Sequence, residues 1–86
     1  EVIKEEFTVE DKVHDILHML LASSSLRLSE LFAKVKNKLE IIVIFLAILE
    51  LIRLKEIIAR QKGLFQEIEI TRNKENIIPY DRRNKA

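Results

Sequence analysis

Residues 39–54, LEIIVIFLAILELIRL, form the most apolar stretch of the chain. Nine consecutive apolar residues, 41–49, lie inside it, and its only charged residues are Glu40, Glu50 and Arg53. No glycine, proline or asparagine interrupts it, which favours an uninterrupted helix. Its 16 residues fall short of the roughly 20 that a transmembrane helix requires. We therefore expect the central helix of a small domain, covered by the domain itself or by another protein.

On a helical wheel this stretch has two unequal faces. The broad face is apolar throughout and is expected to pack in the core; it consists of Ile41, Ile44, Phe45, Ile48, Leu49 and Ile52. The opposite, thinner face has two carboxylates flanking small apolar residues; it consists of Glu40, Val43, Ala47 and Glu50. The thinner face is expected to be either solvated or a docking surface for a partner.

Composition narrows the class of protein. The 86 residues are enough for one domain and include no cysteine, so a disulfide framework and a thiolate metal site are excluded. Residues 1–70 carry 10 basic and 12 acidic side chains, whereas residues 71–86 carry 5 and 2. A mildly acidic body argues against a nucleic-acid surface on the folded part. We see no signal peptide or membrane span and expect an intracellular protein; the first residue, Glu1, suggests an excised fragment.

Before the apolar stretch, the pattern predicts a helix, a short strand and a second helix. Thr8 resembles an N-cap for a helix from Val9 to about Ala22, whose apolar residues recur at helical spacing. Leu26–Leu28 alternates and is interpreted as a small strand. Ser29 is a suitable N-cap for a short helix over Glu30–Val35.

The central helix and the segment after it complete the predicted fold. Asn37 and Glu40 have the spacing of a capping box, so the central helix should start near Lys38. Strands are predicted from Ile57 to Lys62 and from Phe65 to Ile70. Gly63, the only glycine, is expected to make the turn between them, because glycine reaches positive φ without steric cost.

This order predicts a mainly α domain with a small β-sheet: a winged helix with a three-helix core and a two-stranded wing. The short strand after the first helix completes the sheet. The predicted organisation is an N-terminal extension over residues 1–7 with a short edge strand, the winged-helix domain over 8–70, and a polar basic tail over 71–86 that is flexible or bound by a partner.

The predicted recognition helix is poorly suited to DNA. A DNA-reading winged helix places Arg, Lys, Asn, Gln or Ser on that helix, whereas this one carries Glu40 and Glu50. The remaining basic feature of this region is a patch of Lys34, Lys36 and Lys38, which is most simply a solvated surface. Nucleic-acid binding through this patch and the basic tail is kept as the alternative function.

A catalytic or metal-dependent role is not expected. His14 and His18 are four residues apart on the first helix and could share a metal ion, but the sequence offers no third ligand and places them on a solvated flank. A single glycine excludes a phosphate-binding glycine-rich loop. We therefore expect no catalytic residues, no metal and no cofactor.

The segment from residue 28 to residue 70 resembles a known family. The residues that carry the likeness are Phe45-Leu46-Ala47-Ile48-Leu49-Glu50-Leu51-Ile52, then Gln61, Leu64-Phe65 and Ile68, with Leu28-Ser29-Glu30-Leu31-Phe32 ahead of them. This pattern is similar to the C-terminal domain of segregation and condensation protein A, the bacterial and archaeal kleisin. Leu28, Val43 and Glu67 depart from the family pattern.

The resemblance implies a non-catalytic winged-helix domain that binds the ATPase head of a structural maintenance of chromosomes (SMC) protein. The other end of the kleisin would bind the neck of a second SMC subunit, and segregation and condensation protein B would bind elsewhere on the full-length chain. DNA would be held only indirectly, inside the ring complex, in the nucleoid of the cytoplasm and without a membrane.

The candidate residues for contact with the SMC head lie on the central helix and on the wing: Phe45, Leu49, Glu50, Gln61, Leu64, Phe65 and Ile68. Core packing is the competing interpretation for Phe45 and Leu49, and an equal one for Leu64 and Phe65. A second possibility for the helix is that Val43, Ala47 and Glu50 face the partner.

Overall fold

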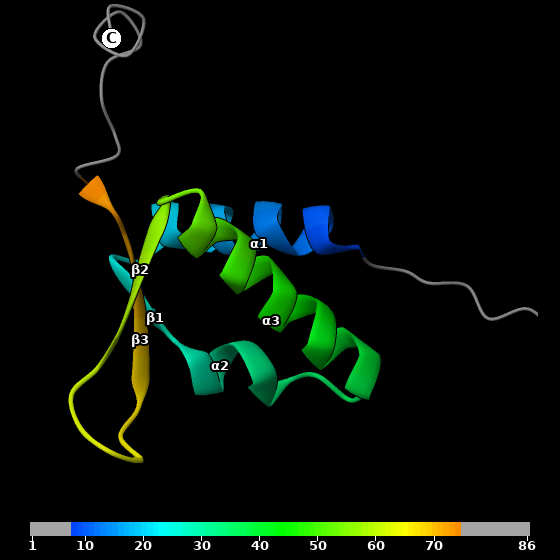
Figure 1. The fold of residues 1–86 in the computed structure, drawn as a ribbon. Coiled ribbons are helices and arrows are strands. Elements are labelled where there is room, and N and C mark those ends of the chain that lie inside the picture. The colour runs from blue at the N-terminus through cyan, green and yellow to red at the C-terminus, as the bar shows by residue number, and fades with distance from the viewer. Residues whose placement is uncertain (1–7, 75–86) are drawn as a thin grey trace, which may run out of the picture.

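The computed structural model describes residues 8–74, which form three helices beside one small antiparallel sheet (Figure 1). In chain order the elements are α1 (Val9–Ala22), β1 (Ser25–Arg27), α2 (Leu28–Ala33), α3 (Lys38–Arg53), β2 (Ile57–Gln61) and β3 (Ile68–Arg72). The strand order is β1-β3-β2, so the short first strand completes the sheet of the hairpin. The predicted winged-helix arrangement is confirmed.

The predicted limits of α1 are confirmed. The Asp11 N–H donates to the Thr8 hydroxyl at 3.0 Å, and the Thr8 N–H donates to the Asp11 carboxylate at 3.1 Å, which closes a capping box. Further along the helix, the Lys12 ammonium lies 2.6 Å from the Glu40 carboxylate of α3. This partly buried ion pair fixes the start of α3 against α1.

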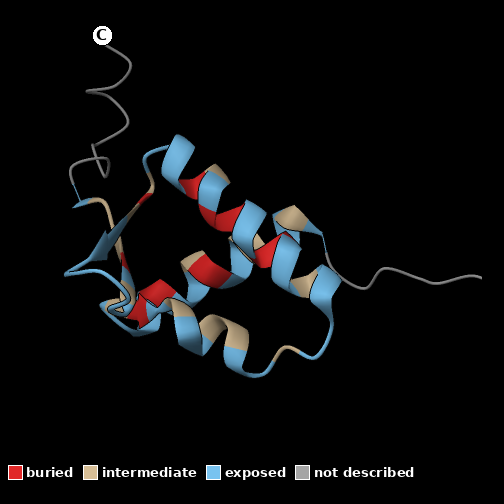
Figure 2. Ribbon diagram, turned by 60° about the horizontal axis from the view of Figure 1, so that its bottom comes forward, coloured by how far each residue is buried: buried red, intermediate tan, exposed pale blue. Residues whose placement is uncertain are grey.

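The core lies where α1, α3 and the inner face of the sheet meet. Figure 2 shows buried segments on these elements, with exposed ribbon on their outer sides. Ile16 of α1, Leu51 of α3 and Ile70 of β3 are the largest side chains that are fully buried. Other apolar residues pack around this cluster, including Leu31, Phe32 and Val35.

The face of α3 that enters the core differs from the predicted broad face. Ile44 and Ile48 are buried as expected, but the other members of that face, Ile41, Phe45, Leu49 and Ile52, are exposed. Buried in their place are Val43, Ala47 and Leu51. The prediction for Val43 and Ala47 as solvated or partner-facing residues is therefore wrong.

Ala47 provides the physical reason for this choice of face. Its small side chain is fully buried within the cluster that Ile16 and Leu20 of α1 also form, so it permits close approach of the two helices. The Lys12–Glu40 ion pair brings the same edge of α3 toward α1. On a helix that is apolar nearly all round, side-chain size and this one charged pair decide which face is buried.

The caps of the other two helices differ from prediction in part. α2 begins at Leu28, and Ser29 is not its N-cap: the Ser29 N–H and hydroxyl donate to the Glu67 carboxylate at 3.1 and 2.8 Å. Asn37 does cap α3, accepting from the Leu39 N–H at 2.7 Å. Glu40 does not close the predicted capping box, because its carboxylate bonds Lys12 instead.

Both strands of the hairpin are one residue shorter than predicted, and the second strand is also shifted toward the C-terminus. β2 ends at Gln61, while β3 starts at Ile68 and continues to Arg72, beyond the predicted end of the strand. The Gln66 N–H closes the turn by donating to the Gly63 carbonyl at 3.0 Å, but Gly63 does not take positive φ. Phe65 does, with φ 63°, so the turn predicted at Gly63 is confirmed but the positive φ predicted for the glycine is wrong. The edge strand predicted within residues 1–7 and the tail beyond Lys74 lie outside the described residues.

Candidate functional site

A row of large apolar side chains is exposed along α3, on the side opposite its core face. We call this row the α3 stripe. Its members, with their exposed fractions, are Ile42 (53%), Phe45 (49%), Leu46 (45%), Leu49 (45%) and Ile52 (39%). Spacings of three and four residues place them on one side of the helix. Contiguous apolar surface of this kind on a small domain marks an interaction site more often than chance exposure.

The α3 stripe resolves the competing interpretations for two predicted residues. Phe45 and Leu49 are exposed, so their core-packing interpretation is wrong and their availability for contact is supported. Ile42 and Leu46 were absent from the predicted site, and Ile52 was placed in the core. Residues 42, 45, 46 and 49 recur at helical spacing on the side of the helix opposite the small Ala47. This pattern in the sequence could have identified the exposed side of α3.

The tip of the β2–β3 hairpin carries a second exposed apolar group. We define the hairpin tip as residues 63–66. Leu64 and Phe65 within it are 82% and 94% exposed, so neither packs in the core. Phe65 also holds the left-handed conformation, which costs a bulky residue about 1–2 kcal/mol. A strained and solvent-facing phenylalanine gives the isolated domain no packing benefit, which points to a role in contact.

The other predicted site residues take part in local contacts. Glu50 accepts two hydrogen bonds from the Arg53 guanidinium, at 3.1 and 2.7 Å, and these bonds lower the pKa of Glu50 and raise the pKa of Arg53. The Gln61 amide donates to the Gln66 carbonyl at 2.8 Å and so braces the hairpin tip. Ile68 is half-buried and lies opposite Gln61 in the β2–β3 register. The predicted residues thus form two groups, one on α3 and one on the hairpin, which diverge from the turn after α3 (Figure 1).

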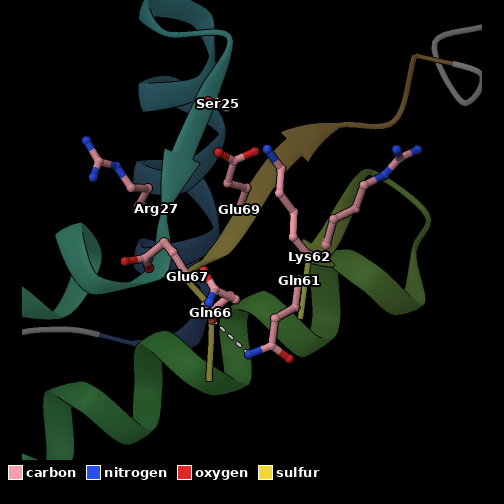
Figure 3. Close-up of a pocket in the computed structure, with 8 residues that line it drawn as sticks. Ser25, Arg27, Gln61, Lys62, Gln66, Glu67 and Glu69 are labelled. Atoms are coloured by element: carbon pink, nitrogen blue, oxygen red, sulfur yellow. Dashed lines mark hydrogen bonds between the residues drawn. The ribbon is translucent and has the colours of Figure 1, made fainter. Parts of the chain in front are cut away.

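The outer face of the sheet forms a groove of about 880 Å³ with mixed charge (Figure 3). Glu69 lies opposite Arg27 on one side and Arg60 on the other, so charges of alternating sign cross the three strands. Lys62 and Glu67 line the same groove. Because acidic and basic groups alternate, the groove favours neither an anionic nor a cationic ligand.

Glu67 connects this groove to the start of α2. Its carboxylate accepts from the backbone N–H and from the hydroxyl of Ser29, and Arg27 lies nearby. These hydrogen bonds, the backbone one above all, hold the pKa of Glu67 below its ordinary value of 4.5. This contact connects the hairpin to the start of α2, so it helps to fix the position of the hairpin tip relative to the helices.

Replacement of Glu67 is expected to reduce the acid sensitivity of the fold. The pKa of Glu67 is lower in the folded state than in the unfolded state. Its ionised carboxylate therefore stabilises the fold at pH values above the ordinary pKa, and this stabilisation is lost as the pH falls through the pKa of the folded state. Between about pH 5 and pH 3, wild type should lose more free energy of unfolding than Glu67→Gln. Urea denaturation at several pH values measures this, with Glu69→Gln as the matched control. An equal loss in wild type and Glu67→Gln would contradict the assigned contact.

The histidine pair of α1 and the lysine patch before α3 give little support for a further functional site. His14 and His18 are exposed on α1, and residues 8–74 contain no group of three or more His, Cys, Asp or Glu side chains that could hold a metal ion. Lys34, Lys36 and Lys38 are all exposed around the start of α3. None of the described helices is long and apolar enough to cross a membrane.

Comparison with known proteins shows the family. The sequence model described as "Segregation and condensation protein ScpA" matches residues 1–73. The chain belongs to the segregation and condensation protein A family. The matched range includes both the α3 stripe and the hairpin tip, and it ends one residue after β3. The family resemblance inferred from residues 28–70 is confirmed.

Curated members of the segregation and condensation protein A family are similar over most of this chain. A relative from Thermoanaerobacter sp. (strain X514) is 46% identical over 70 residues, which is 81% of this chain and 29% of the relative. A relative from Streptococcus pneumoniae serotype 19F is 36% identical over 74 residues, or 86% of this chain and 31% of the relative. The Clostridium acetobutylicum protein is 38% identical over 66 residues, which is 77% of this chain and 26% of the relative. The chain spans less than a third of the length of each.

Proposed function

We propose that this chain is a non-catalytic interaction domain of a kleisin and that it binds the ATPase head of an SMC protein. The observation that carries the proposal is the α3 stripe: its five large apolar side chains stay exposed on a helix that also supplies half of the buried hydrophobic residues in the described range. Family membership supports a role in chromosome segregation and condensation. Any ATPase activity belongs to the partner.

The proposed contact combines two kinds of surface. The α3 stripe offers a firm apolar face, because the same helix is held by the core on its other side. Burying such a face against a partner contributes about 25 cal/mol per Å² of apolar area removed from water. The hairpin tip adds Leu64 and Phe65 as protruding anchors, and removal of an aromatic anchor can cost about 2 kcal/mol or more.

The wider assembly follows from the same proposal. The other end of the kleisin would bind the neck of a second SMC subunit, and segregation and condensation protein B would bind elsewhere on the full-length chain. DNA would be held through the closed ring, without a dedicated DNA surface on this domain, in the nucleoid of the cytoplasm. No membrane and no cofactor take part in this proposal.

Calorimetric titration of the 86-residue chain with an isolated SMC head tests the proposal. We expect saturable binding with one domain per head. A head from an unrelated ATPase serves as the control and should give no heat of binding. The absence of binding to the SMC head by a folded domain, as judged by circular dichroism, would overturn the proposal.

Nucleic-acid binding is the second candidate function. It is favoured by the winged-helix arrangement together with the exposed lysines 34, 36 and 38. It is disfavoured by the outer side of α3, which presents apolar side chains where base-reading helices present polar and basic ones. This candidate predicts DNA affinity that falls steeply with salt. A mobility assay at two salt concentrations decides it, because no shift even at low salt would exclude it.

Phe65→Gly is expected to separate binding from folding. Loss of the aromatic anchor should weaken binding to the SMC head by about tenfold or more. The free energy of unfolding should stay within about 1 kcal/mol of wild type or rise, because glycine relieves the left-handed strain. Leu21→Ala is the matched control: Leu21 is 74% exposed on α1, away from both surfaces, and its removal should leave affinity unchanged. Unchanged affinity in Phe65→Gly would exclude the hairpin tip from the contact.

A further inference from the structure

The chain leaves the folded domain beside the C-terminal end of α3. Asn73, just after β3, is fixed there by two hydrogen bonds: its N–H donates to the Glu56 carbonyl and its side-chain amide to the Lys55 carbonyl, both at 3.0 Å. Lys55 and Glu56 form the turn that follows α3. Figure 1 shows the end of β3 near this end of the helix. Whatever follows Asn73 therefore starts next to one end of the α3 stripe.

The sequence that follows contains one apolar segment. Within residues 75–86, Ile77-Ile78-Pro79-Tyr80 is flanked by polar and charged residues on both sides. The family match ends at residue 73, so this segment lies outside the part shared with the family model. Proline restricts the residue before it to extended conformations, which lowers the entropy lost when such a segment is laid along a surface.

The distances are compatible with contact between this segment and the α3 stripe. Ile77 and Tyr80 follow Asn73 by four and seven residues, so they reach at most about 14 and about 25 Å from it. The stripe from Ile52 to Ile42 covers ten residues of α3, or about 15 Å. The near half of the stripe, Leu49 and Ile52, is thus within reach.

We propose that residues 77–80 pack in cis on the C-terminal half of the α3 stripe, against Leu49 and Ile52, and that the partner displaces them. A tethered segment has an effective concentration near millimolar, so at micromolar protein it occupies the stripe ahead of a second copy of the chain. The displacement rests on the proposed function, whereas the contact in cis does not. The segment would act as a built-in competitor that shields the stripe until the partner arrives.

Paramagnetic relaxation enhancement tests the contact without any partner. The chain has no cysteine, so Asp81→Cys provides a single site for a nitroxide label next to Tyr80. We expect broadening of the amide signals of Leu49 and Ile52, and none at His18 on α1. In a mixed sample, one chain carries the nitroxide without isotope enrichment and the other is isotope-enriched without a nitroxide. The signals of the enriched chain should then show no broadening. Broadening that is absent from α3, or that is equally strong in the mixed sample, would overturn the proposal.

Two paired variants sharpen the test. Ile77→Asn with Ile78→Asn removes the apolar side chains and should abolish the broadening on α3. Arg82→Gln with Arg83→Gln removes charge from the same tail and should leave the broadening in place. In titration with the SMC head, the isoleucine variant should bind about threefold or more tightly than wild type. Broadening that survives loss of both isoleucines would overturn the proposal. Failure of the head to bind at all would count against the proposed function alone.

Discussion

Leu49→Asp is expected to lower affinity for the SMC head by at least about 100-fold while leaving the domain folded. Leu49 lies at the centre of the α3 stripe and is 45% exposed on the body of the domain, so an aspartate there leaves the core intact. In the complex the carboxylate would be buried against apolar surface without a partner charge. A 100-fold loss corresponds to about 2.7 kcal/mol, within the range for a buried interface position. Calorimetric titration measures the loss, and circular dichroism checks the fold.

The control for this prediction places the same charge elsewhere. Leu21→Asp introduces an aspartate at an exposed leucine of α1 and should leave affinity for the head unchanged. Loss of binding in both variants would indicate a general effect of added negative charge. Unchanged binding in Leu49→Asp, together with loss in Phe65→Gly, would move the contact entirely to the hairpin tip. Unchanged binding in both would leave the two surfaces without the role proposed for them.

The elements of the fold follow from local signals that act over a few residues. Thr8 and Asp11 close the cap of α1 within the first turn, and Asn37 caps α3 in the same local way. A short strand was likewise predicted from the alternation at residues 26–28, one residue later than β1, and the hairpin from the runs around Gly63. Interactions between distant residues were not visible. Ser29 has the chemistry of an N-cap, but it bonds Glu67, which is 38 positions away.

The buried face of α3 was the main feature that periodicity could not decide. Because nearly every position of the helix is apolar, the wheel offers two plausible core faces and favours the one with the larger side chains. The structure buries the face with Ala47, since close packing against α1 depends on a small residue at the crossing. The larger side chains, Phe45 and Leu49 among them, are left outside. The size of the side chain at the crossing of α1 and α3 was therefore a better guide to the exposed face of α3 than the total hydrophobicity of each face.

The hairpin tip was found by family resemblance and not by a physical signal. A short turn with Leu64 and Phe65 is compatible with either core packing or contact, and the left-handed Phe65 could not be anticipated beside a glycine that is free to take that conformation. The choice depends on how the turn closes. The Gln66 N–H bonds the Gly63 carbonyl, which places Phe65, and not Gly63, in the third position of the turn.

Leu51→Ala is expected to lower the free energy of unfolding by about 3 kcal/mol, whereas Leu49→Ala should lower it by no more than about 1 kcal/mol. The two leucines are two positions apart on α3, yet Leu51 is fully buried and Leu49 is 45% exposed. Removing Leu51 leaves a cavity between α1, α3 and the sheet. A loss of this size is large, because native proteins in general are stable by only about 5–15 kcal/mol. Urea denaturation of the two variants measures both values.

The same pair of variants should show the opposite order in binding. At a temperature where both remain folded, Leu51→Ala keeps the α3 stripe and should bind the SMC head nearly as well as wild type, while Leu49→Ala should bind about tenfold more weakly. A large stability loss in Leu49→Ala that persists when Ile77 and Ile78 are also replaced would mean that the body of the domain covers Leu49. If instead Leu49→Ala lost more stability and Leu51→Ala lost more affinity, Leu49 would belong to the core and Leu51 to the interface. That result would contradict the burial of Leu51 and the exposure of Leu49 in the structure.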